Sequence, residues 1–320
     1  MNGRVPDFFI AGHAKSGTTA LYEMLREHPQ IYMPALKEPQ FFAPEMRAGH
    51  ERQFAGLPQT LEQYAALFAD AQPGQRAGEA SPSYLRSPEA PGLIAEQRPD
   101  ARIVALLREP ASYLRSVHMQ FVRAMIETEH DLGKALALEP ARREGRKLPR
   151  NAYLPQALRY SEHVRYAEQV RRYRSTFSDG QVLILIYDDF QRDNQATVRE
   201  VLRFLEVDDT IALAPVRANP SFAVRSQRLH RLTRAVHLGQ GPGSRAVKSG
   251  VNTVFPRRLR ESAFGPARRY VRRRVLFGET PAVDERLMLE LRRRYEPEVR
   301  ALSECLGRDL VALWGYDRLD

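Results

Sequence analysis

The segment 9–19, FIAGHAKSGTT, constrains the fold of this chain more than any other. An apolar strand at residues 8–11 leads directly into a turn that carries Gly12 and Gly17, and a helix begins at about Thr18. Glycine lets the backbone turn tightly and approach a ligand. The first amide groups of a helix have no partners within it and carry the positive end of its dipole. This turn therefore predicts a binding site for a phosphate-like anion.

The side chains of the turn distinguish it from the loop of the nucleotide triphosphatases. In that loop, G-x-x-x-x-G-K-[ST], the lysine directly follows the second glycine, and the next residue supplies a hydroxyl that holds magnesium. Here Lys15 and Ser16 precede Gly17, which argues against a metal–nucleotide site of that kind. Lys15 adds a mobile positive charge, while Ser16, Thr18 and Thr19 add hydroxyl donors.

The order Lys-Ser-Gly-Thr-Thr resembles the 5'-phosphosulfate loop of the sulfotransferases that use 3'-phosphoadenosine-5'-phosphosulfate (PAPS). A second match follows the apolar run 103–107, which predicts a central parallel strand that ends at Arg108. Ligands of open α/β sheets bind at this end of the strands. The resemblance implies that Arg108 and Ser116 bind the 3'-phosphate of the donor, and a guanidinium can bind phosphate in a bidentate manner. A strand-end salt bridge is the alternative for Arg108.

The segment 37–42, KEPQFF, resembles the Lys-Glu-Pro-x-Phe-Phe segment of bacterial and heparan-type sulfotransferases. The resemblance implies that Glu38 is the general base and places Lys37 beside the acceptor. Pro39 and the two phenylalanines are expected to desolvate the Glu38 carboxyl partly, which would raise its pKa toward a useful range. The alternative is a surface glutamate paired with Lys37.

A weaker match is the segment 78–84, GEASPSY, at the end of another expected strand. Glu79 and Ser81 either face the acceptor or fix the strand end by hydrogen bonds. Several glycosaminoglycan-modifying relatives have a substrate-binding lysine where this chain has Ala80, which weakens an assignment to a heparan-type polysaccharide.

Strands and helices alternate along the chain, which predicts an α/β fold of the P-loop-like three-layer α/β/α type with a central parallel sheet. We expect a single domain over residues 1–320, with a core at 5–210 and a helical C-terminal part at 211–320 that covers the donor and acceptor sites. The sequence further predicts a surface excursion at 128–150 and a long helix at about 154–177. Three further elements are expected to have a structural role only: a strand at 181–186, a helix at 194–205 and a closing helix at 284–306.

The composition indicates the cellular compartment of the protein. Cys305 is the single cysteine, so intramolecular disulfides are excluded, and no secretory signal or run of eighteen apolar residues is present. These features predict a cytoplasmic location.

The net charge is +10, and residues 222–300 hold 19 Lys or Arg against 7 Asp or Glu, so the rest of the chain carries about −2. This basic part is expected to attract a polyanionic nucleotide, an acidic acceptor or a membrane surface, to which the protein would bind peripherally. No nucleic-acid-binding motif occurs, so nucleic acid is not an expected partner. Arg225 and Arg228 are candidates for contacts to the adenosine and 3'-phosphate.

These motifs together predict a sulfotransferase that moves the sulfuryl group of PAPS to a hydroxyl or amine and releases 3'-phosphoadenosine-5'-phosphate (PAP), without a metal. Lys15 would stabilise the transition state, and the acceptor would be a small molecule, a lipid or a carbohydrate. Two alternatives remain open at this point: a P-loop kinase or nucleotide triphosphatase, and a non-catalytic module of the same fold that binds nucleotides or polyanions.

Overall fold

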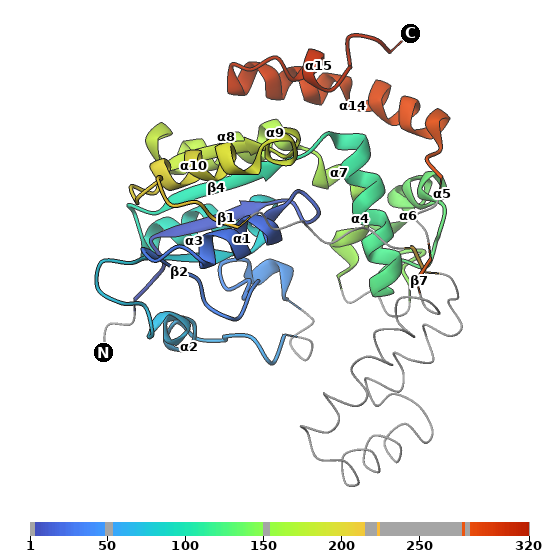
Figure 1. Cartoon of the computed structure of the whole chain (residues 1–320). Helices are drawn as coiled ribbons and strands as arrows, with labels where there is room; N and C mark the ends of the chain where they lie inside the picture. Colours follow the sequence, from blue (N-terminus) through green and yellow to red (C-terminus); the bar gives the residue numbers. More distant parts are fainter. Residues whose placement is uncertain are drawn as a thin grey trace.

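The computed structural model describes residues 4–48, 54–149, 154–214 and 282–319, and the backbone of the short pair 223–224 and 277–278. A five-stranded parallel sheet lies at its centre, between helices (Figure 1). The strand order is β2-β3-β1-β4-β5, and every neighbouring pair is parallel. The strands are β1 (Phe8–Gly12), β2 (Ile31–Tyr32), β3 (Arg76–Ala80), β4 (Arg102–Leu107) and β5 (Val182–Ile186). The predicted α/β fold with a central parallel sheet is confirmed.

The two faces of the sheet are covered by different helices. Phe8 and Ile10 pack with α1 and α10, whereas Phe9 and Ala11 pack with α3, α4 and α8. Side chains alternate across a strand, so β1, buried throughout, needs apolar residues on both sides. The covering helices are α1 (Thr18–Arg26), α3 (Ala90–Gln97), α4 (Pro110–Ala124), α8 (Tyr166–Thr176) and α10 (Asn194–Phe204).

The sheet brings the predicted motifs to one edge. Because all five strands run in the same direction, the residues that follow β1, β3, β4 and β5 lie at the carboxyl edge, where α/β proteins bind ligands. Each of these strands is directly followed by a residue or loop of the predicted site or its surroundings. These are the anion loop (residues 13–17) after β1, Ser81 after β3, Arg108 after β4 and Tyr187 after β5.

The segment 128–150 is not the surface excursion that the sequence predicts. It contains α5 (Leu132–Ala137) and α6 (Glu139–Arg143). A buried ion pair holds α6 to the turn that follows α4. The Arg142 guanidinium donates from Nη1 and Nη2 to the two carboxylate oxygens of Glu127 at 2.7 and 2.8 Å. The polar composition of the segment suggested an exposed loop. The charges of Glu127 and Arg142 can nevertheless be buried, because they pair with each other.

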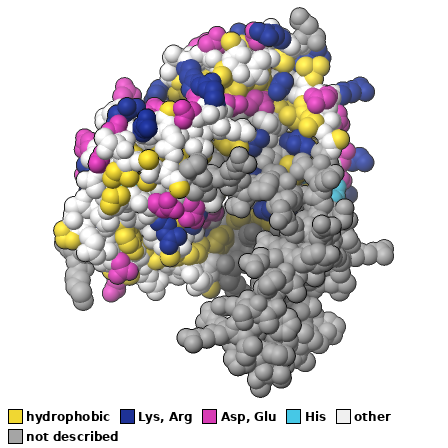
Figure 2. Space-filling view, in the orientation of Figure 1, with side chains coloured by type: hydrophobic (Ala, Val, Ile, Leu, Met, Phe, Trp, Pro, Cys, Tyr) yellow, Lys and Arg dark blue, Asp and Glu magenta, His cyan; other side chains and the backbone are white. Residues whose placement is uncertain are grey.

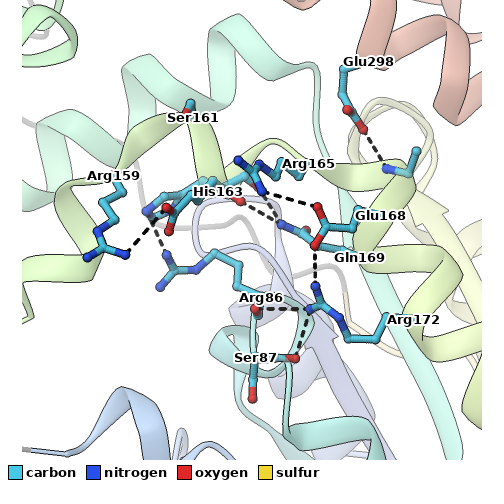
Figure 3. A network of polar contacts seen from close by, with 12 residues as sticks. Arg86, Ser87, Arg159, Ser161, His163, Arg165, Glu168, Gln169, Arg172 and Glu298 are labelled. Carbon is cyan, nitrogen blue, oxygen red and sulfur yellow. Dashed lines mark hydrogen bonds and ion pairs between the residues drawn. The ribbon is translucent and has the colours of Figure 1, made fainter. Parts of the chain in front are cut away.

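The predicted long helix 154–177 is also wrong, since the chain forms a 3-10 turn η4 (Pro155–Leu158), a short helix α7 (Tyr160–His163) and then α8. Figure 3 shows the polar network that holds this break. Gln169 Nε2 donates to the carbonyl of His163 at 3.3 Å, near the end of α7. Arg86 Nη1 lies 2.9 Å from His163 Nε2, and Arg172 Nη1 donates to the carbonyl of Ser87 at 3.2 Å. The network joins α7 and α8 to the turn after β3.

The remaining elements complete the layers and close the chain. The long helix α14 packs against α4 and α8 and is followed by the single turn α15. The remaining bounds are 3-10 turns η1 (Pro44–Met46), η2 (Ala66–Phe68), η3 (Pro82–Leu85) and η5 (Asp179–Gln181), helices α2 (Leu61–Ala65), α9 (Tyr187–Arg192), α14 (Glu285–Leu306) and α15 (Leu310–Leu313), and the antiparallel pair β6 (Ala223–Val224) and β7 (Phe277–Gly278).

Charged side chains of both signs are interspersed over the described part of the face in Figure 2. This distribution agrees with the nearly balanced charge of the chain outside residues 222–300. Most of that basic stretch lies outside the described residues. Within the described ranges, no helix has both the length and the apolar composition that crossing a bilayer requires.

Candidate active site

The turn after β1 has the backbone geometry of an anion-binding loop. Lys15 and Gly17 adopt positive φ angles of 71° and 92°, and Gly17 is the N-cap of α1. A Cβ atom on Gly17 would lie 2.9 Å from the Phe190 ring, so both the conformation and the space favour glycine. No side chain of the described residues caps α1 at its N-terminus. Its first amides therefore remain able to bind an anion.

Two cations meet beside this loop. Arg108 Nη1 donates to the backbone carbonyl of Lys15 at 3.1 Å. Burial, and then the charges of Arg123 and Arg108, lower the pKa of Lys15, as expected where positive groups lie close together. Within the described ranges neither Lys15 nor Arg108 forms an ion pair with a carboxylate. The loop is consequently an electropositive site.

Two serine hydroxyls of the predicted site are buried without a hydrogen-bond partner among the described residues. They are Ser16 Oγ in the loop and Ser116 Oγ in α4. Leaving such a group unsatisfied costs about 1–3 kcal/mol. An oxyanion would accept a hydrogen bond from each hydroxyl, so both serines fit the phosphate contacts that the sequence predicts. Thr18 is buried and Thr19 partly exposed at the start of α1.

Tyr187 is a contact that sequence reasoning missed. Its ring centroid lies 4.8 Å from the Arg108 guanidinium carbon, within the range of a cation–π interaction. Tyr187 directly follows β5, and β5 pairs with β4, which precedes Arg108. The sequence indicated both strand ends but not that the two strands are neighbours, so it gave no sign of this contact.

The loop that carries Glu38 is fixed by three hydrogen bonds to the turn after β3. Glu38 N donates to the carbonyl of Ala80 at 3.0 Å, and Gln40 N donates to Ser81 Oγ at 3.0 Å. Phe42 N donates to Tyr84 Oη at 3.1 Å. Glu38 and Gln40 have φ angles of 59° and 52°, an uncommon conformation for residues with side chains that is often found at functional sites.

The expected desolvation of Glu38 is not observed. Its side chain is 44% exposed, and Lys37 Nζ lies 2.5 Å from Glu38 Oε1. The phenylalanines pack elsewhere, since Phe41 stacks on Tyr64 with the ring centroids 4.6 Å apart and Phe42 is buried in the core. Glu38 thus lies at the surface in contact with a cation.

Glu79 is the buried carboxyl of this region. It is 0% exposed, and Glu79 Oε2 accepts hydrogen bonds from Tyr64 Oη and Tyr84 Oη, each at 2.8 Å. Burial raises the pKa of Glu79 to about 7 despite these hydrogen bonds. The structure therefore places Glu79 and Ser81 under the Glu38 loop, where they fix the strand end, the second of the two interpretations drawn from the sequence.

His13 lies at the start of the anion loop but contributes no positive charge to it. Its side chain is buried, and His13 Nε2 lies 2.9 Å from Gln169 Oε1. Burial, and next the charge of Arg86, lower the pKa of His13 to about 3. The positive charge at the loop therefore comes from Lys15 and Arg108. Arg225 and Arg228, the other predicted donor contacts, lie outside the described residues.

Comparison with known proteins agrees with this geometry. The model of the sulfotransferase family matches residues 6–210. A mouse heparan sulfate glucosamine 3-O-sulfotransferase 3A1 is 32% identical over 117 residues, which cover 37% of this chain and 27% of that protein. The human carbohydrate sulfotransferase 15 is 27% identical over 254 residues, which cover 63% of this chain and 44% of that protein. The matches thus span less than half of each relative.

Among solved structures, a sulfotransferase from Alicyclobacillus acidocaldarius superposes with a TM-score of 0.66 at 26% sequence identity. The superposition covers 97% of this chain and 98% of that one. The family model spans the sheet, the anion loop and Arg108, the parts from which the site is built. This chain therefore belongs to the sulfotransferase family.

Proposed function

We propose that the protein transfers the sulfuryl group of PAPS to a hydroxyl or amine of an acceptor. One observation carries the proposal: Ser16 and Ser116 have buried hydroxyls without a hydrogen-bond partner among the described residues. Ser16 belongs to the loop where the cations Lys15 and Arg108 meet, and Ser116 belongs to the helix that follows Arg108. PAPS carries a phosphosulfate at one end and a 3'-phosphate at the other. A donor with two anionic groups requires two such anion sites in one protein.

The residues divide between the two anionic ends of the donor. Lys15 and the amides from Ser16 to Thr19 hold the 5'-phosphosulfate, where the α1 N-terminus supplies further positive potential. Arg108 and Ser116 hold the 3'-phosphate, and Tyr187 keeps the guanidinium in place from its other side. Catalysis of this kind depends mainly on positioning and charge stabilisation.

In the transfer step, the acceptor oxygen or nitrogen forms a bond to sulfur while the bond from sulfur to the bridging phosphate oxygen breaks. Lys15 stabilises the negative charge that develops on this bridging oxygen, and Glu38 takes the proton from the acceptor. A half-exposed Glu38 suits a base that must reach an incoming acceptor. Lys37 is the further predicted residue on the acceptor side.

The acceptor is proposed to be a small molecule, a lipid or a carbohydrate. The named relatives include a carbohydrate sulfotransferase, so sugars are the first class to screen. Ala80 stands in place of the substrate-binding lysine of several glycosaminoglycan-modifying relatives, so short saccharides should precede heparan-type polymers in that screen.

Calorimetric titration tests the donor site directly. Wild-type protein and Arg108→Ala would be titrated with PAP and, separately, with magnesium-ATP. We expect tight PAP binding that Arg108→Ala abolishes, and no comparable binding of magnesium-ATP. Preference for magnesium-ATP would instead favour the kinase or triphosphatase alternative. Asp188 and Asp189, the acidic residues after β5, already bind protein groups, which speaks against that alternative.

Lys15→Ala tests the catalytic step. Removing one preorganised donor costs about 3 kcal/mol in the transition state, so kcat should fall by about a hundredfold or more. PAP affinity should fall less, because the 3'-phosphate contacts remain. Equal losses in kcat and in PAP affinity would show that Lys15 only binds the donor. Donor binding without transfer to any acceptor, in the wild type, would support the non-catalytic module.

A further inference from the structure

Three acidic residues stand next in sequence to Arg108 or to the tyrosine that it contacts. Glu109 directly follows Arg108, while Asp188 and Asp189 directly follow Tyr187, whose ring contacts the Arg108 guanidinium. A carboxylate and a phosphate bind a guanidinium in the same bidentate way. Any of these carboxylates that turned toward Arg108 would therefore compete with the donor.

Each of the three carboxylates is instead bound by a residue from the C-terminal end of the chain. The donors are the side chains of one short segment, residues 308–316, which includes α15. The contacts are Tyr316 Oη to Glu109 Oε1 at 2.6 Å, Trp314 Nε1 to Asp188 Oδ2 at 3.0 Å and Arg308 Nη1 to Asp189 Oδ2 at 2.5 Å.

The segment is well placed to hold these carboxylates. Trp314 and Tyr316 are buried in the same apolar cluster as β4, and Asp309 caps α15 by accepting a hydrogen bond from Ala312 N at 2.9 Å. Tyr316 N donates to the carbonyl of Val311 at 2.8 Å, which folds the end of the chain back on α15. The donors are therefore fixed before any ligand arrives.

Glu109 has further contacts that hold its carboxylate. Its carboxylate accepts hydrogen bonds from Ala111 N at 3.0 Å and Ser112 N at 2.7 Å, and so caps α4. Arg292 Nε, from α14, lies 3.8 Å from Glu109 Oε1. As a result Arg108 contacts the Lys15 carbonyl and the Tyr187 ring, and forms no ion pair with a carboxylate of the described residues.

We propose that Arg308, Trp314 and Tyr316 are positioning residues for the donor site, which hold Asp189, Asp188 and Glu109 away from Arg108 and so keep its guanidinium available to the 3'-phosphate. This inference rests on the proposed function, since it assigns Arg108 to the donor. It adds a role for a part of the chain that touches neither the donor nor the acceptor in the proposed mechanism.

Tyr316→Phe removes the hydroxyl that holds Glu109 and leaves the ring. Hydrogen bonds to charged groups contribute enough that PAP affinity should fall about tenfold. The KM for the donor should rise in parallel, while kcat at saturating donor stays within about twofold, because no group at the reacting atoms changes. Tyr32→Phe is the matched control, since Tyr32 Oη donates to the carbonyl of Leu67 at 3.0 Å on the edge strand β2.

A double-mutant cycle separates charge control from mere packing. In a Glu109→Gln background the competing charge is gone, so adding Tyr316→Phe should weaken PAP binding by less than about twofold. A tenfold loss that persists in this background would overturn the proposal, because the hydroxyl would then act only through packing. Arg308→Gln, on a half-exposed side chain, gives an independent test if Tyr316→Phe does not fold, and its effect should disappear in an Asp189→Asn background.

The outcomes also separate this inference from the proposed function. If wild-type protein fails to bind PAP, both are overturned. If the wild type binds PAP and Arg108→Ala does not, the donor site stands. In that case, equal PAP affinities for Tyr316→Phe, Arg308→Gln and the Tyr32→Phe control would overturn the positioning role alone.

Discussion

At the scale of single residues, the sequence predicted that Glu38 would be both the base of the motif and a partly desolvated carboxyl. In the structure these two properties belong to different residues, Glu38 and Glu79. Glu38 occupies the motif position of the base but is half exposed, whereas Glu79 is buried and carries the raised pKa. The motif predicted which residues belong to the site. Burial could not be predicted from it, because Glu79 is buried by Tyr64 and Tyr84 from separate turns of the chain.

The raised pKa of Glu79 makes a prediction about stability and pH. The folded state holds its proton up to a pH of about 7, while the unfolded chain releases it near 4.5. The contribution of protonated Glu79 to stability is therefore fully present below the pKa of the unfolded state. It is lost as the pH rises to and through the pKa of the folded state. The stability of the wild type relative to Glu79→Gln should fall by up to about 3 kcal/mol between pH 4.5 and 7.5.

Urea unfolding of both proteins across this pH range would measure the difference. Comparison with Glu79→Gln cancels the contributions of buried histidines such as His13, which run in the opposite direction. Glu96→Gln, at an exposed position of α3, is the control and should follow the wild-type curve. Parallel curves for the wild type and Glu79→Gln would contradict the raised pKa.

At the scale of elements, strands and the helices beside them were predictable, and the small helices were not. The apolar runs of β1, β4 and β5 and the caps of α10 and α14 are local signals. The break between α7 and α8 has no local signal in the sequence. Gln169 donates to the backbone carbonyls that the break exposes, and Arg86 contacts the imidazole of His163. Such partners come from tertiary contacts.

The buried ion pair between Arg142 and Glu127, which holds α6, allows a prediction about the stability of the fold. The side chains of Arg142 and Glu127 are 1% and 0% exposed, so Arg142→Met would leave a buried carboxylate without its partner. We expect a loss of about 3–5 kcal/mol in the free energy of unfolding. The double variant Glu127→Leu, Arg142→Met should recover much of this loss, because no charge then remains buried.

Chemical denaturation would measure these values, with Arg146→Met as the control. Arg146 pairs with Glu144 in an exposed position, and its removal should cost less than about 1 kcal/mol. Equal costs for Arg142→Met and Arg146→Met would show that the buried pair contributes no more than a surface pair.

At the scale of the whole molecule, donor binding should stabilise the fold, because the site joins segments that unfolding separates. PAP at about 100 times its Kd adds about 2.7 kcal/mol to the free energy of unfolding. We expect PAP to raise the Tm by several degrees in the wild type and not in Arg108→Ala, as measured by calorimetry. A comparable rise with magnesium-ATP would contradict the assigned donor.

The order of the strands in the sheet could not be predicted from the sequence. Alternation of strands and helices along the chain predicted parallel strands and the edge that binds ligands. The contacts of residues 308–316 were not predictable, since nothing local in this segment indicates contact with residues near 109 and 188.

The hydrogen bond from Tyr316 to Glu109 joins residues 207 positions apart. A ribosome that adds about 5–20 residues each second needs about 10–40 s to pass from one to the other. Once β5 has been made, the chain contains all five strands of the sheet, but Glu109 still lacks the hydroxyl of Tyr316. Donor binding should therefore reach full strength only after residues 308–316 have emerged from the ribosome, and a nascent chain halted before residue 308 should be retained more weakly on immobilised PAP than the full chain.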